Sequence, residues 1–400
     1  MLETVASIVL LLIMISIIVS FHEYGHYSIA RLFNTRIDRF SVGFGKVVWS
    51  RRDKRGVEWA ISALPLGGYV KFAGDENIAS MSPSFDELEA ARASIAAREG
   101  EAAVKDYFHF KPLWQRFLII LAGPVFNFIL AIIVFSVINM TLGSVSVTPL
   151  VQSVLPNMPG YAAGFKPGDV ITSVEGHDTP SVNDVIRRVA MRADTPTRVV
   201  VLRNHQSVTL VVTPKRATLD TGDKHATTQG GVIGLTLGGH GAFHRDDPFT
   251  AVVHGTGETW DVIDTNLTYI GRIFIGKENG SQLTGVIGMT KVTSDAVKDV
   301  AAEKEPLAEK SLDLTFTCVQ LIAFISIGVG FVNLLPIPIL DGGHLVFYLI
   351  QSVTKKPVSG GIQTAAFPIA VALIVGLMLF AGWNDINHTG LAQYIGRLFS

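Results

Sequence analysis

The stretch that decides the fold is residues 5–26, VASIVLLLIMISIIVSFHEYGH. Its apolar part, Val5–Phe21, carries no charge and approaches the ~18 residues that a helix needs to cross a lipid bilayer. No positively charged leader precedes it and no small-residue cleavage site follows, so we do not expect a cleaved signal peptide. We expect a retained membrane helix that continues, without a breaker, into His22, Glu23 and His26.

Three further segments are similarly apolar and uncharged: Phe117–Leu142, Leu314–Leu340 and Gln363–Trp383. Each is long enough to cross a bilayer. The composition agrees, since hydrophobic residues make up 48% of the 400-residue chain, charged residues only 17%, and the mean hydropathy is +0.39. The sequence therefore predicts a polytopic α-helical membrane protein with four transmembrane helices.

Charge and cysteine usage exclude several classes of protein. The formal net charge of -1 excludes a general basic surface of the kind that binds nucleic acid, so we expect no nucleic-acid partner. The single cysteine, Cys318, excludes a disulfide within the chain and a cysteine-based metal site.

Basic residues predict the orientation, because loops rich in Lys and Arg stay in the cytoplasm. They follow the first span, precede the second, and lie between the third and the fourth: Arg31, Arg36, Arg39, Lys46, Arg51, Arg52, Lys54, Arg55, Lys111, Arg116, Lys355 and Lys356. We therefore expect a multi-pass protein of a bacterial inner membrane. Both termini and the long segment from Gly143 to Asp313 would face the periplasm.

The spans predict an order of parts along the chain. They are a first transmembrane helix (1–35), a cytoplasmic loop (36–112), a second transmembrane helix (113–142), an extracytoplasmic α+β domain (143–238), amphipathic helices with a linker (239–312), a third transmembrane helix (313–351), and a fourth with the C-terminal tail (352–400). In the cytoplasmic loop, the alternating Val57–Phe72 predicts a β-hairpin around Gly67 and Gly68. The Ala- and Glu-rich Phe85–Phe108 predicts an interfacial helix.

Four short β-rich runs predict the strands of the extracytoplasmic domain: Leu150–Val154, Asp169–Val174, Thr197–Leu202 and Ser207–Val212. Val182–Arg192 predicts a helix between them, and Gly231–Leu237 predicts one further strand. Pro248–Gly276 is amphipathic and is expected to lie along the outer membrane surface. A glycine-broken segment, Leu283–Met289, and a polar helix, Ser294–Lys310, should follow.

The residues His22, Glu23 and His26 carry the clearest chemical signal. Two histidines four residues apart project from one helix face and can share a tetrahedral zinc ion, while a glutamate beside them can take a proton from water on that ion. Burying these groups in an apolar span costs several kcal/mol unless they have partners. A third ligand is needed, and Asp341 should reach the same cytoplasmic half of the bilayer. His344 is the alternative third ligand.

A break in the third span should come just before Asp341. Pro336 and Pro338 each remove a backbone donor and disfavour helix at the preceding residue. Unwound backbone within a membrane is tolerated only where protein or water covers it. We therefore expect this stretch to form part of a cavity wall around the metal.

Two motifs together resemble the signature of the site-2 protease family of zinc intramembrane metalloproteases. They are HEYGH at His22–His26 and NLLPIPILDG at Asn333–Gly342. The chain also resembles the bacterial regulator-of-sigma-E protease branch of that family in GFGK at Gly43–Lys46, PLGGYVK at Pro65–Lys71 and AGPVFNF at Ala122–Phe128.

A further stretch, Tyr161–Gly176, resembles part of a PDZ domain. After Pro214 the chain has room for one closing strand but not for a second domain, so it resembles a single-PDZ form of the branch. The expected fold thus combines the four transmembrane helices with a cytoplasmic β-hairpin region and an extracytoplasmic α+β PDZ domain.

The resemblance implies one Zn²⁺ per chain, bound by His22, His26 and Asp341, with Glu23 as the general base. The ion would polarise a substrate carbonyl, and Glu23 would take a proton from water and later protonate the leaving amine.

The resemblance also implies substrate-binding residues in a groove and on a β-edge that pairs with an unwound substrate: Asn333, Pro336, Pro338, Gly67, Gly68 and Tyr69. Asn127, in the middle of the second span, is expected to form hydrogen bonds between helices rather than to take part in chemistry.

The implied function is regulated intramembrane proteolysis in the lipid bilayer. The substrates would be single-span membrane proteins, either anti-sigma factors or remnant signal peptides. Two alternatives belong to other classes: a non-catalytic PDZ-bearing scaffold and a membrane metal transporter. Zinc flux into sealed vesicles would identify the transporter, and binding without cleavage would identify the scaffold.

Overall fold

The computed structural model describes residues 2–74, 85–220, 227–239, 241–277, 280, 288–290, 293–295, 307–356, 358 and 360–388. The chain divides into two compact units. The first unit comprises Met1–Phe135 and Met289–Phe380, and the second comprises Ser136–Gly288 and Ala381–Ser400.

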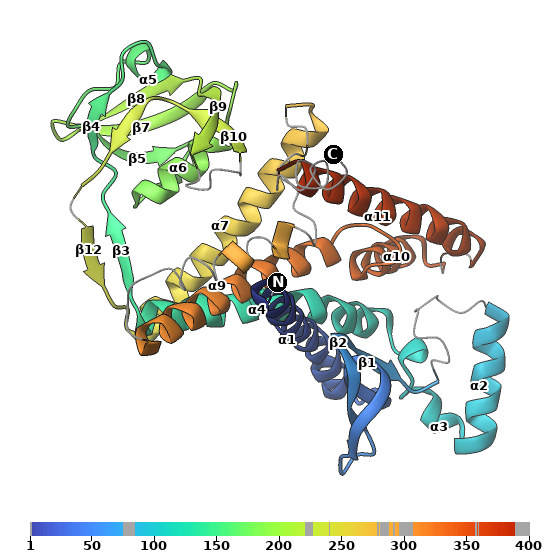
Figure 1. Ribbon diagram of the computed structural model, residues 1–400. Coiled ribbons are helices and arrows are strands. Elements are labelled where there is room, and N and C mark those ends of the chain that lie inside the picture. Colours follow the sequence, from blue (N-terminus) through green and yellow to red (C-terminus); the bar gives the residue numbers. More distant parts are fainter. Residues whose placement is uncertain are drawn as a thin grey trace, which may run out of the picture. The chain divides into compact units, whose positions relative to one another are not determined.

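Four helices among the described residues are long and apolar enough to cross a membrane: α1 (Leu2–Leu32), α4 (Leu113–Thr141), α9 (Leu307–Asn333) and α11 (Gly360–His388) (Figure 1). This confirms a membrane protein with four candidate spanning helices. Shorter helices are α2 (Phe85–Glu99), α3 (Glu101–Val104), the 3₁₀ turn η1 (Phe108–Phe110) and α10 (Asp341–Thr354).

The third apolar segment is not one continuous helix. The helix α9 ends at Asn333, and α10 begins at Asp341. The intervening Leu334–Leu340 is not helical, as Pro336 and Pro338 predict. The break expected just before Asp341 is therefore observed.

The helix α1 ends in a well-defined cap. Asn34 adopts the left-handed conformation (φ 53°), and the N–H of Thr35 donates to the carbonyl of Ala30 at 2.8 Å. The buried ammonium of Lys111 donates to the carbonyl of Phe33 at 2.8 Å. A cation therefore satisfies a carbonyl that the end of the helix leaves without a partner.

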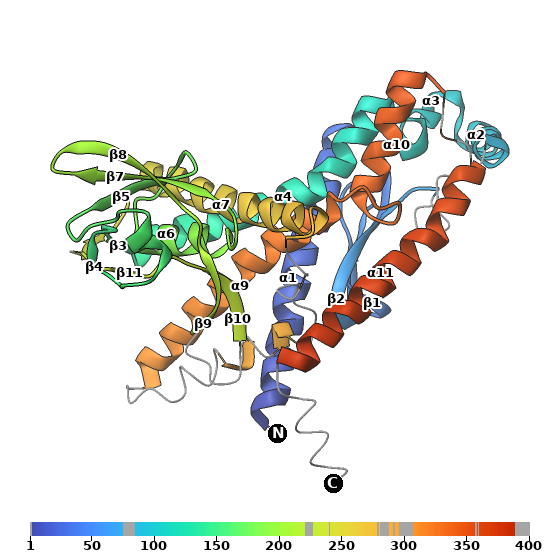
Figure 2. The same ribbon diagram turned by 90° about the horizontal axis from the view of Figure 1, so that it is seen from above.

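The strands β1 (Ile37–Arg52) and β2 (Glu58–Phe72) form an antiparallel sheet beside α1, as the view in Figure 2 also shows. Both strands bend sharply, so residues 39–42 pair on one side with residues 58–61 and on the other with residues 68–71. The packing of this sheet on α1 and α4 buries one core: Tyr27, Ala30, Ile37, Phe40, Val57, Phe72, Phe108 and Ile119.

The predicted hairpin had its turn in the wrong place. The turn lies at residues 53–56, where the Asp53 carboxylate accepts the backbone N–H of Arg55 and of Val57. Gly67 instead lies inside β2 with φ +128°, where a side chain would press on Val19 of α1. The strand β1 was missed because its glycines and charged residues resemble a loop.

The second unit contains the α+β domain. Its strands are β3 (Ser144–Val147), β4 (Val151–Val154), β5 (Val170–Val174), β6 (His177–Asp178), β7 (Thr197–Arg203), β8 (Gln206–Val212), β9 (Lys215–Asp220), β10 (Thr227–Val232), β11 (Leu235–Leu237) and β12 (Gly241–His244). Its helices are α5 (Pro159–Ala162), α6 (Val182–Ala190) and α7 (Pro248–Phe274). The main sheet is antiparallel in the order β6-β5-β7-β8, and three two-stranded pairs join β4 to β11, β9 to β10, and β3 to β12.

The four predicted strands and both predicted helices of this unit are observed to within a few residues. The single strand expected over Gly231–Leu237 is wrong, because Gly234 (φ +76°) makes a turn within it. The two halves belong to different pairs, β10 with β9 and β11 with β4. The segments expected at Leu283–Met289 and Ser294–Lys310 lie largely outside the described residues.

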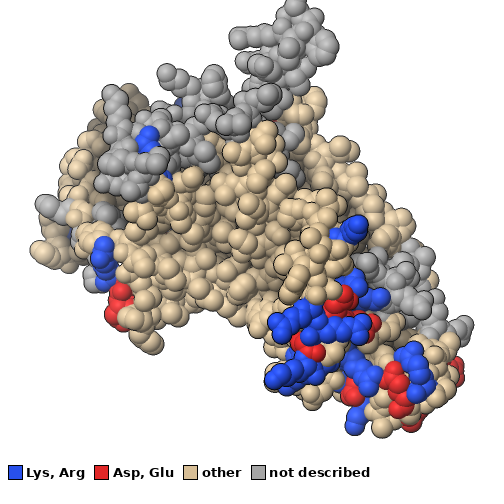
Figure 3. Space-filling view, turned by 60° about the horizontal axis from the view of Figure 1, so that its bottom comes forward, with Lys and Arg blue, Asp and Glu red and all other residues tan. Residues whose placement is uncertain are grey.

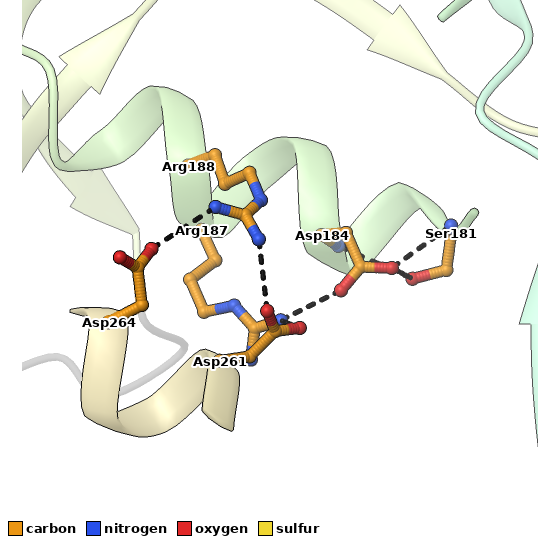
Figure 4. A network of polar contacts seen from close by, with 6 residues as sticks. All are labelled: Ser181, Asp184, Arg187, Arg188, Asp261 and Asp264. Atoms are coloured by element: carbon orange, nitrogen blue, oxygen red, sulfur yellow. Dashed lines mark hydrogen bonds and ion pairs between the residues drawn. The ribbon is translucent and has the colours of Figure 1, made fainter. Parts of the chain in front are cut away.

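Ion pairs join α7 to α6 within the second unit (Figure 4). Arg187 pairs with Asp184 of its own helix at 2.8 Å and with Asp261 of α7 at 3.1 Å. Arg188 pairs with Asp261 at 2.9 Å and with Asp264 at 3.5 Å. Because these charges share partners in a network, they fix the two helices better than isolated surface pairs would.

The core of the α+β domain is apolar, and a buried carboxylate closes one end of it. Both oxygens of Asp169 accept from the Arg203 guanidinium, at 2.7 and 2.8 Å, and one also accepts the N–H of Lys166 at 2.9 Å. Burial alone would raise the pKa of Asp169, but these hydrogen bonds hold the pKa below its ordinary value.

We expect this domain to lose stability in acid. A depressed pKa adds stability that is complete above the unfolded-state pKa of about 3.9 and is lost as the pH falls further. Hydrogen exchange of the β5 and β7 amides in the full-length protein, followed from pH 7 to pH 3, should show falling protection in the wild type. Asp169→Asn should be less protected at pH 7 and less dependent on pH. Equal protection and equal slopes in the two proteins would contradict this account.

Candidate metal centre

Three side chains converge at one point in the first unit. The Nε2 atoms of His22 and His26 lie 3.1 Å apart. The Oδ2 atom of Asp341 lies 3.0 Å from Nε2 of His22 and 3.6 Å from Nε2 of His26. Both histidines are buried, and the Asp341 side chain is 17% exposed. Within the described residues, these three form the group that could hold a metal ion.

The geometry of this group fits zinc. Nitrogen and oxygen ligands that lie about 2.0–2.1 Å from a tetrahedral zinc ion are about 3.3 Å from one another. The three observed separations bracket that value. Oδ2 of Asp341 is buried with no hydrogen-bond partner of good geometry, as suits an atom that binds a metal. The donor set of two imidazoles and one carboxylate is typical of a hydrolytic zinc site with one open position.

Local structure brings Asp341 to the two histidines. It is the first residue of α10, directly after the unwound stretch, while His22 and His26 lie one turn apart on α1. Gly342 and Gly343 follow it, and a Cβ at these positions would clash with the carbonyl oxygens of Leu334 and Ile337. The two glycines therefore let the start of α10 pack directly on the unwound backbone, which fixes the position of the carboxylate.

The helix α4 packs against both histidine rings and contacts their Nδ1 atoms. A Cβ on Gly123 would clash with Nε2 of His26 and lie 2.7 Å from Cε1 of His22, so only glycine lets α4 approach the two rings. The carbonyl of Ile119 lies 2.8 Å from Nδ1 of His26. A carbonyl can only accept, so Nδ1 carries the proton and Nε2 keeps its lone pair for a metal. The other histidine has a side-chain neighbour, since the amide of Asn127 lies 3.2 Å from Nδ1 of His22.

Glu23 lies beside the ligands and is bound to the sheet. One of its oxygens accepts the backbone N–H of Val70, in β2, at 3.0 Å. Because that N–H points at Glu23, it does not pair with β1, and this edge of β2 faces the site. The arrangement holds a carboxylate next to a candidate metal position while leaving its second oxygen for water or substrate.

A cavity of about 300 Å³ opens on this group. Its lining comes from α1, β2, η1, α4, α9 and the start of α10: Val19, His22, Glu23, His26, Tyr69, Val70, Lys71, Phe72, Phe108, His109, Ile120, Val329, Asn333, Ile339, Leu340 and Asp341. Residues of an apolar helix, an edge of β2 and the three candidate ligands therefore line one cavity.

Only some of the residues predicted to bind substrate line the cavity. Tyr69 and Asn333 line the cavity, whereas Pro336, Pro338 and the two glycines Gly67 and Gly68 are absent from its described lining. Gly67 and Gly68 instead permit close packing of β2 on β1 and on α1. The prolines shape the unwound stretch that leads to the cavity.

His344, the alternative third ligand, is not a member of the described ligand group, and its ring packs edge-on against Phe347. Sequence reasoning also missed three contributors: Gly123, the carbonyl of Ile119, and the N–H of Val70. The AGPVFNF motif lies in the segment of α4 that contacts the two histidines. That contact could not be derived from the sequence, since it joins α4 to a helix about one hundred residues away in the chain.

Known proteins are similar to this chain over most of its length. The family model described as Peptidase family M50 matches residues 10–377. The chain is 43% identical over 394 residues to metalloprotease MmpA of Caulobacter vibrioides, covering 98% of each protein. It is 36% identical over 385 residues to the zinc metalloprotease candidate Atu1380 of Agrobacterium fabrum, covering 95% of each. It is 29% identical over 390 residues to the candidate RC0203 of Rickettsia conorii, covering 96% of this chain and 99% of the relative.

A methyl group at Gly123 should empty the metal site. We expect Gly123→Ala to push both imidazoles apart and to lower the zinc content of the purified protein several-fold, measured by atomic absorption after dialysis. The matched control is Gly328→Ala in α9, because a Cβ there meets nothing within 4 Å. Full zinc content in Gly123→Ala would show that the close approach of α4 is unnecessary for binding.

Proposed function

Because the chain belongs to peptidase family M50, we propose that this membrane zinc metalloprotease hydrolyses a peptide bond within the transmembrane segment of a single-span protein. The proposal is supported above all by one feature of the site. Two of the three candidate zinc ligands, His22 and His26, lie on a helix that is apolar enough to cross a bilayer, and an edge of β2 lines the same cavity. A protease that acts in solution would not need metal ligands on a helix that can cross a bilayer.

The catalytic roles follow from the positions of the side chains. His22, His26 and Asp341 would hold the ion. Bound zinc supplies a Lewis acid for the scissile carbonyl and makes a water molecule acidic enough to ionise near neutral pH. Glu23 would accept the proton of that water and deliver it to the leaving amine. The N–H of Val70 keeps the Glu23 carboxylate at the site between turnovers.

The exposed edge of β2 is suited to an extended substrate. A peptide bond in a helix is shielded by its own hydrogen bonds, so a helical substrate must unwind before a carbonyl can reach the ion. Tyr69 and its neighbours up to Phe72 line the cavity and would pair with the unwound segment by strand addition. Asn333 would donate to backbone groups of the substrate from the opposite wall, and Pro336 and Pro338 keep that wall from closing into a helix.

The charge distribution supports an orientation in an inner membrane. In the view of Figure 3, most of the charged side chains gather over the part of the first unit that β1, β2, α2 and α3 form. Exposed cations there include Lys46, Arg51, Arg52, Lys54 and Arg55. We assign this region to the cytoplasm by the positive-inside rule. Both termini and the α+β domain would then be periplasmic.

The α+β domain is proposed to be a single PDZ domain. Support comes from the order of its elements, in which the short α5 follows β4 and the longer α6 lies between β5 and β7. Such a domain outside the membrane would restrict which proteins reach the cavity. The substrates would be membrane proteins already shortened on that side, such as anti-sigma factors or remnant signal peptides. α7, with Trp260 and Phe274 exposed, would lie along the outer membrane surface.

Removing the proposed general base should abolish cleavage and spare the metal. We expect Glu23→Gln to retain zinc and to cleave a single-span test substrate in detergent at least about 100-fold more slowly, because general-base catalysis contributes about 10²–10⁴. The matched control, Glu101→Gln, changes an exposed glutamate of α3 and should cleave normally. Cleavage by Glu23→Gln at the wild-type rate would remove Glu23 from the mechanism.

The hydrogen bond that positions Glu23 can be tested at one N–H group, that of Val70. Val70→Pro removes the donor that faces the cavity without removing a β1 pairing bond, whereas Val70→Ala keeps the donor. We expect Val70→Pro to lower kcat/KM roughly 10- to 100-fold, as for loss of a hydrogen bond to a charged or reacting group, with zinc content unchanged. Val70→Ala should stay near the wild-type value. The two variants behaving alike would show that the N–H has no part in the reaction.

A further inference from the structure

We propose that Asn127 is a positioning residue for the metal site: its side-chain oxygen accepts the Nδ1–H of His22 and so keeps the Nε2 lone pair of His22 free for the ion. This inference rests on the metal-binding role proposed for His22. It assigns to a buried amide of α4 a function beyond the packing of helices.

The position of Asn127 leaves its side chain little choice of partner. The residue is fully buried on α4. Its amide nitrogen lies 3.2 Å from Nδ1 of His22, and its Oδ1 is buried with no hydrogen-bond partner. An asparagine amide has almost the same shape when its oxygen and nitrogen are exchanged, so the chemistry of the neighbours decides which atom faces His22.

The tautomer of His22 decides between the two orientations. If the amide nitrogen donated to Nδ1, the proton of a neutral imidazole would be on Nε2. Nε2, however, faces Oδ2 of Asp341 and Nε2 of His26 at 3.0 and 3.1 Å, and a protonated Nε2 cannot bind a metal. With Oδ1 toward His22, the proton lies on Nδ1, the buried oxygen gains a donor, and Nε2 points its lone pair at the candidate zinc position.

The partner of His26 provides an independent comparison. The carbonyl of Ile119 can only accept, so it forces the proton of His26 onto Nδ1. Ile119 and Asn127 lie two turns apart on α4, facing two histidines one turn apart on α1. If Asn127 also accepts, one helix fixes the same tautomer in both ligands. Acceptors of this kind orient metal-binding histidines and raise their basicity.

Neighbouring side chains hold Asn127 in place. The hydroxyl of Ser326, in α9, donates to the backbone carbonyl of Asn127 at 2.9 Å and is itself fully buried. Gly330 of α9 lies so near that a Cβ there would be 3.0 Å from the Cβ of Asn127. The backbone and Cβ of Asn127 are therefore packed closely against α9, while its amide faces His22 of α1.

The test compares two variants of residue 127, one with a hydrogen-bond acceptor in its side chain and one without. Asn127→Asp keeps two oxygens and removes the N–H group, whereas Asn127→Leu removes both. The matched control is Asn139→Leu, which deletes another buried asparagine of α4 whose amide binds Glu258 instead. Zinc affinity of the full-length protein is measured by competition with a chelator. The absorption spectrum of the Co²⁺-substituted protein reports ligand geometry, and cleavage of the test substrate is recorded separately.

We expect Asn127→Leu to bind zinc 10- to 100-fold more weakly, the range found when partners of metal ligands are removed, and to show an altered cobalt spectrum. Asn127→Asp should bind zinc at least as tightly as the wild type, and Asn139→Leu should match the wild type. Wild-type zinc affinity in Asn127→Leu would overturn the proposal. So would an Asn127→Asp protein that binds zinc about 10-fold or more weakly than the wild type, and this arm remains decisive if the leucine variant does not fold. Failure of the proposed function can be distinguished from failure of this inference. If the wild type binds zinc but cleaves no substrate, the zinc affinities of the variants still test the role of Asn127.

Discussion

The need to satisfy two imidazoles buried in an otherwise apolar helix is the constraint on which the rest of the first unit depends. An unpaired polar group in such surroundings costs several kcal/mol, because the hydrocarbon around a membrane helix offers it no hydrogen-bond partner. Each ring nitrogen of His22 and His26 therefore has a neighbour: Asp341 on one side, and the Ile119 carbonyl or the Asn127 amide on the other. Gly123 is the residue that allows α4 to come close enough to supply the last two.

The same constraint accounts for the irregular parts of the structure. A carboxylate can reach the histidines only if the apolar segment that carries it stops being helical, which is why Leu334–Leu340 is unwound and glycines follow Asp341. The bend of β2 at Gly67 brings a strand edge to the opposite wall, where the Val70 N–H meets Glu23. A cavity with unpaired backbone on one wall and candidate zinc ligands on the other suits a substrate that must unwind before it is cut.

Much of this arrangement could be predicted from the sequence, and the limits have physical causes. The spacing of His22 and His26 and the prolines before Asp341 are local signals, and the three side chains do meet. The strand β1 was missed because glycines and arginines obscure its alternation, and the turn was misplaced because Gly67 and Gly68 serve close packing rather than a reversal. The contribution of Asn127 depends on a contact between α1 and α4, which no local pattern encodes. The break in the third apolar segment could be predicted from Pro336 and Pro338, although hydropathy alone does not distinguish helix from unwound backbone.

The measurement that tests the central claim most directly is the location of the cut. A single-span test protein with a defined apolar segment would be incubated in lipid vesicles with the purified full-length protease, and the product termini would be mapped by mass spectrometry with and without a zinc chelator. The account predicts new termini inside the apolar segment that disappear when zinc is removed. Termini confined to the flanking polar regions, or cleavage that persists without zinc, would contradict an intramembrane protease built on His22, His26 and Asp341.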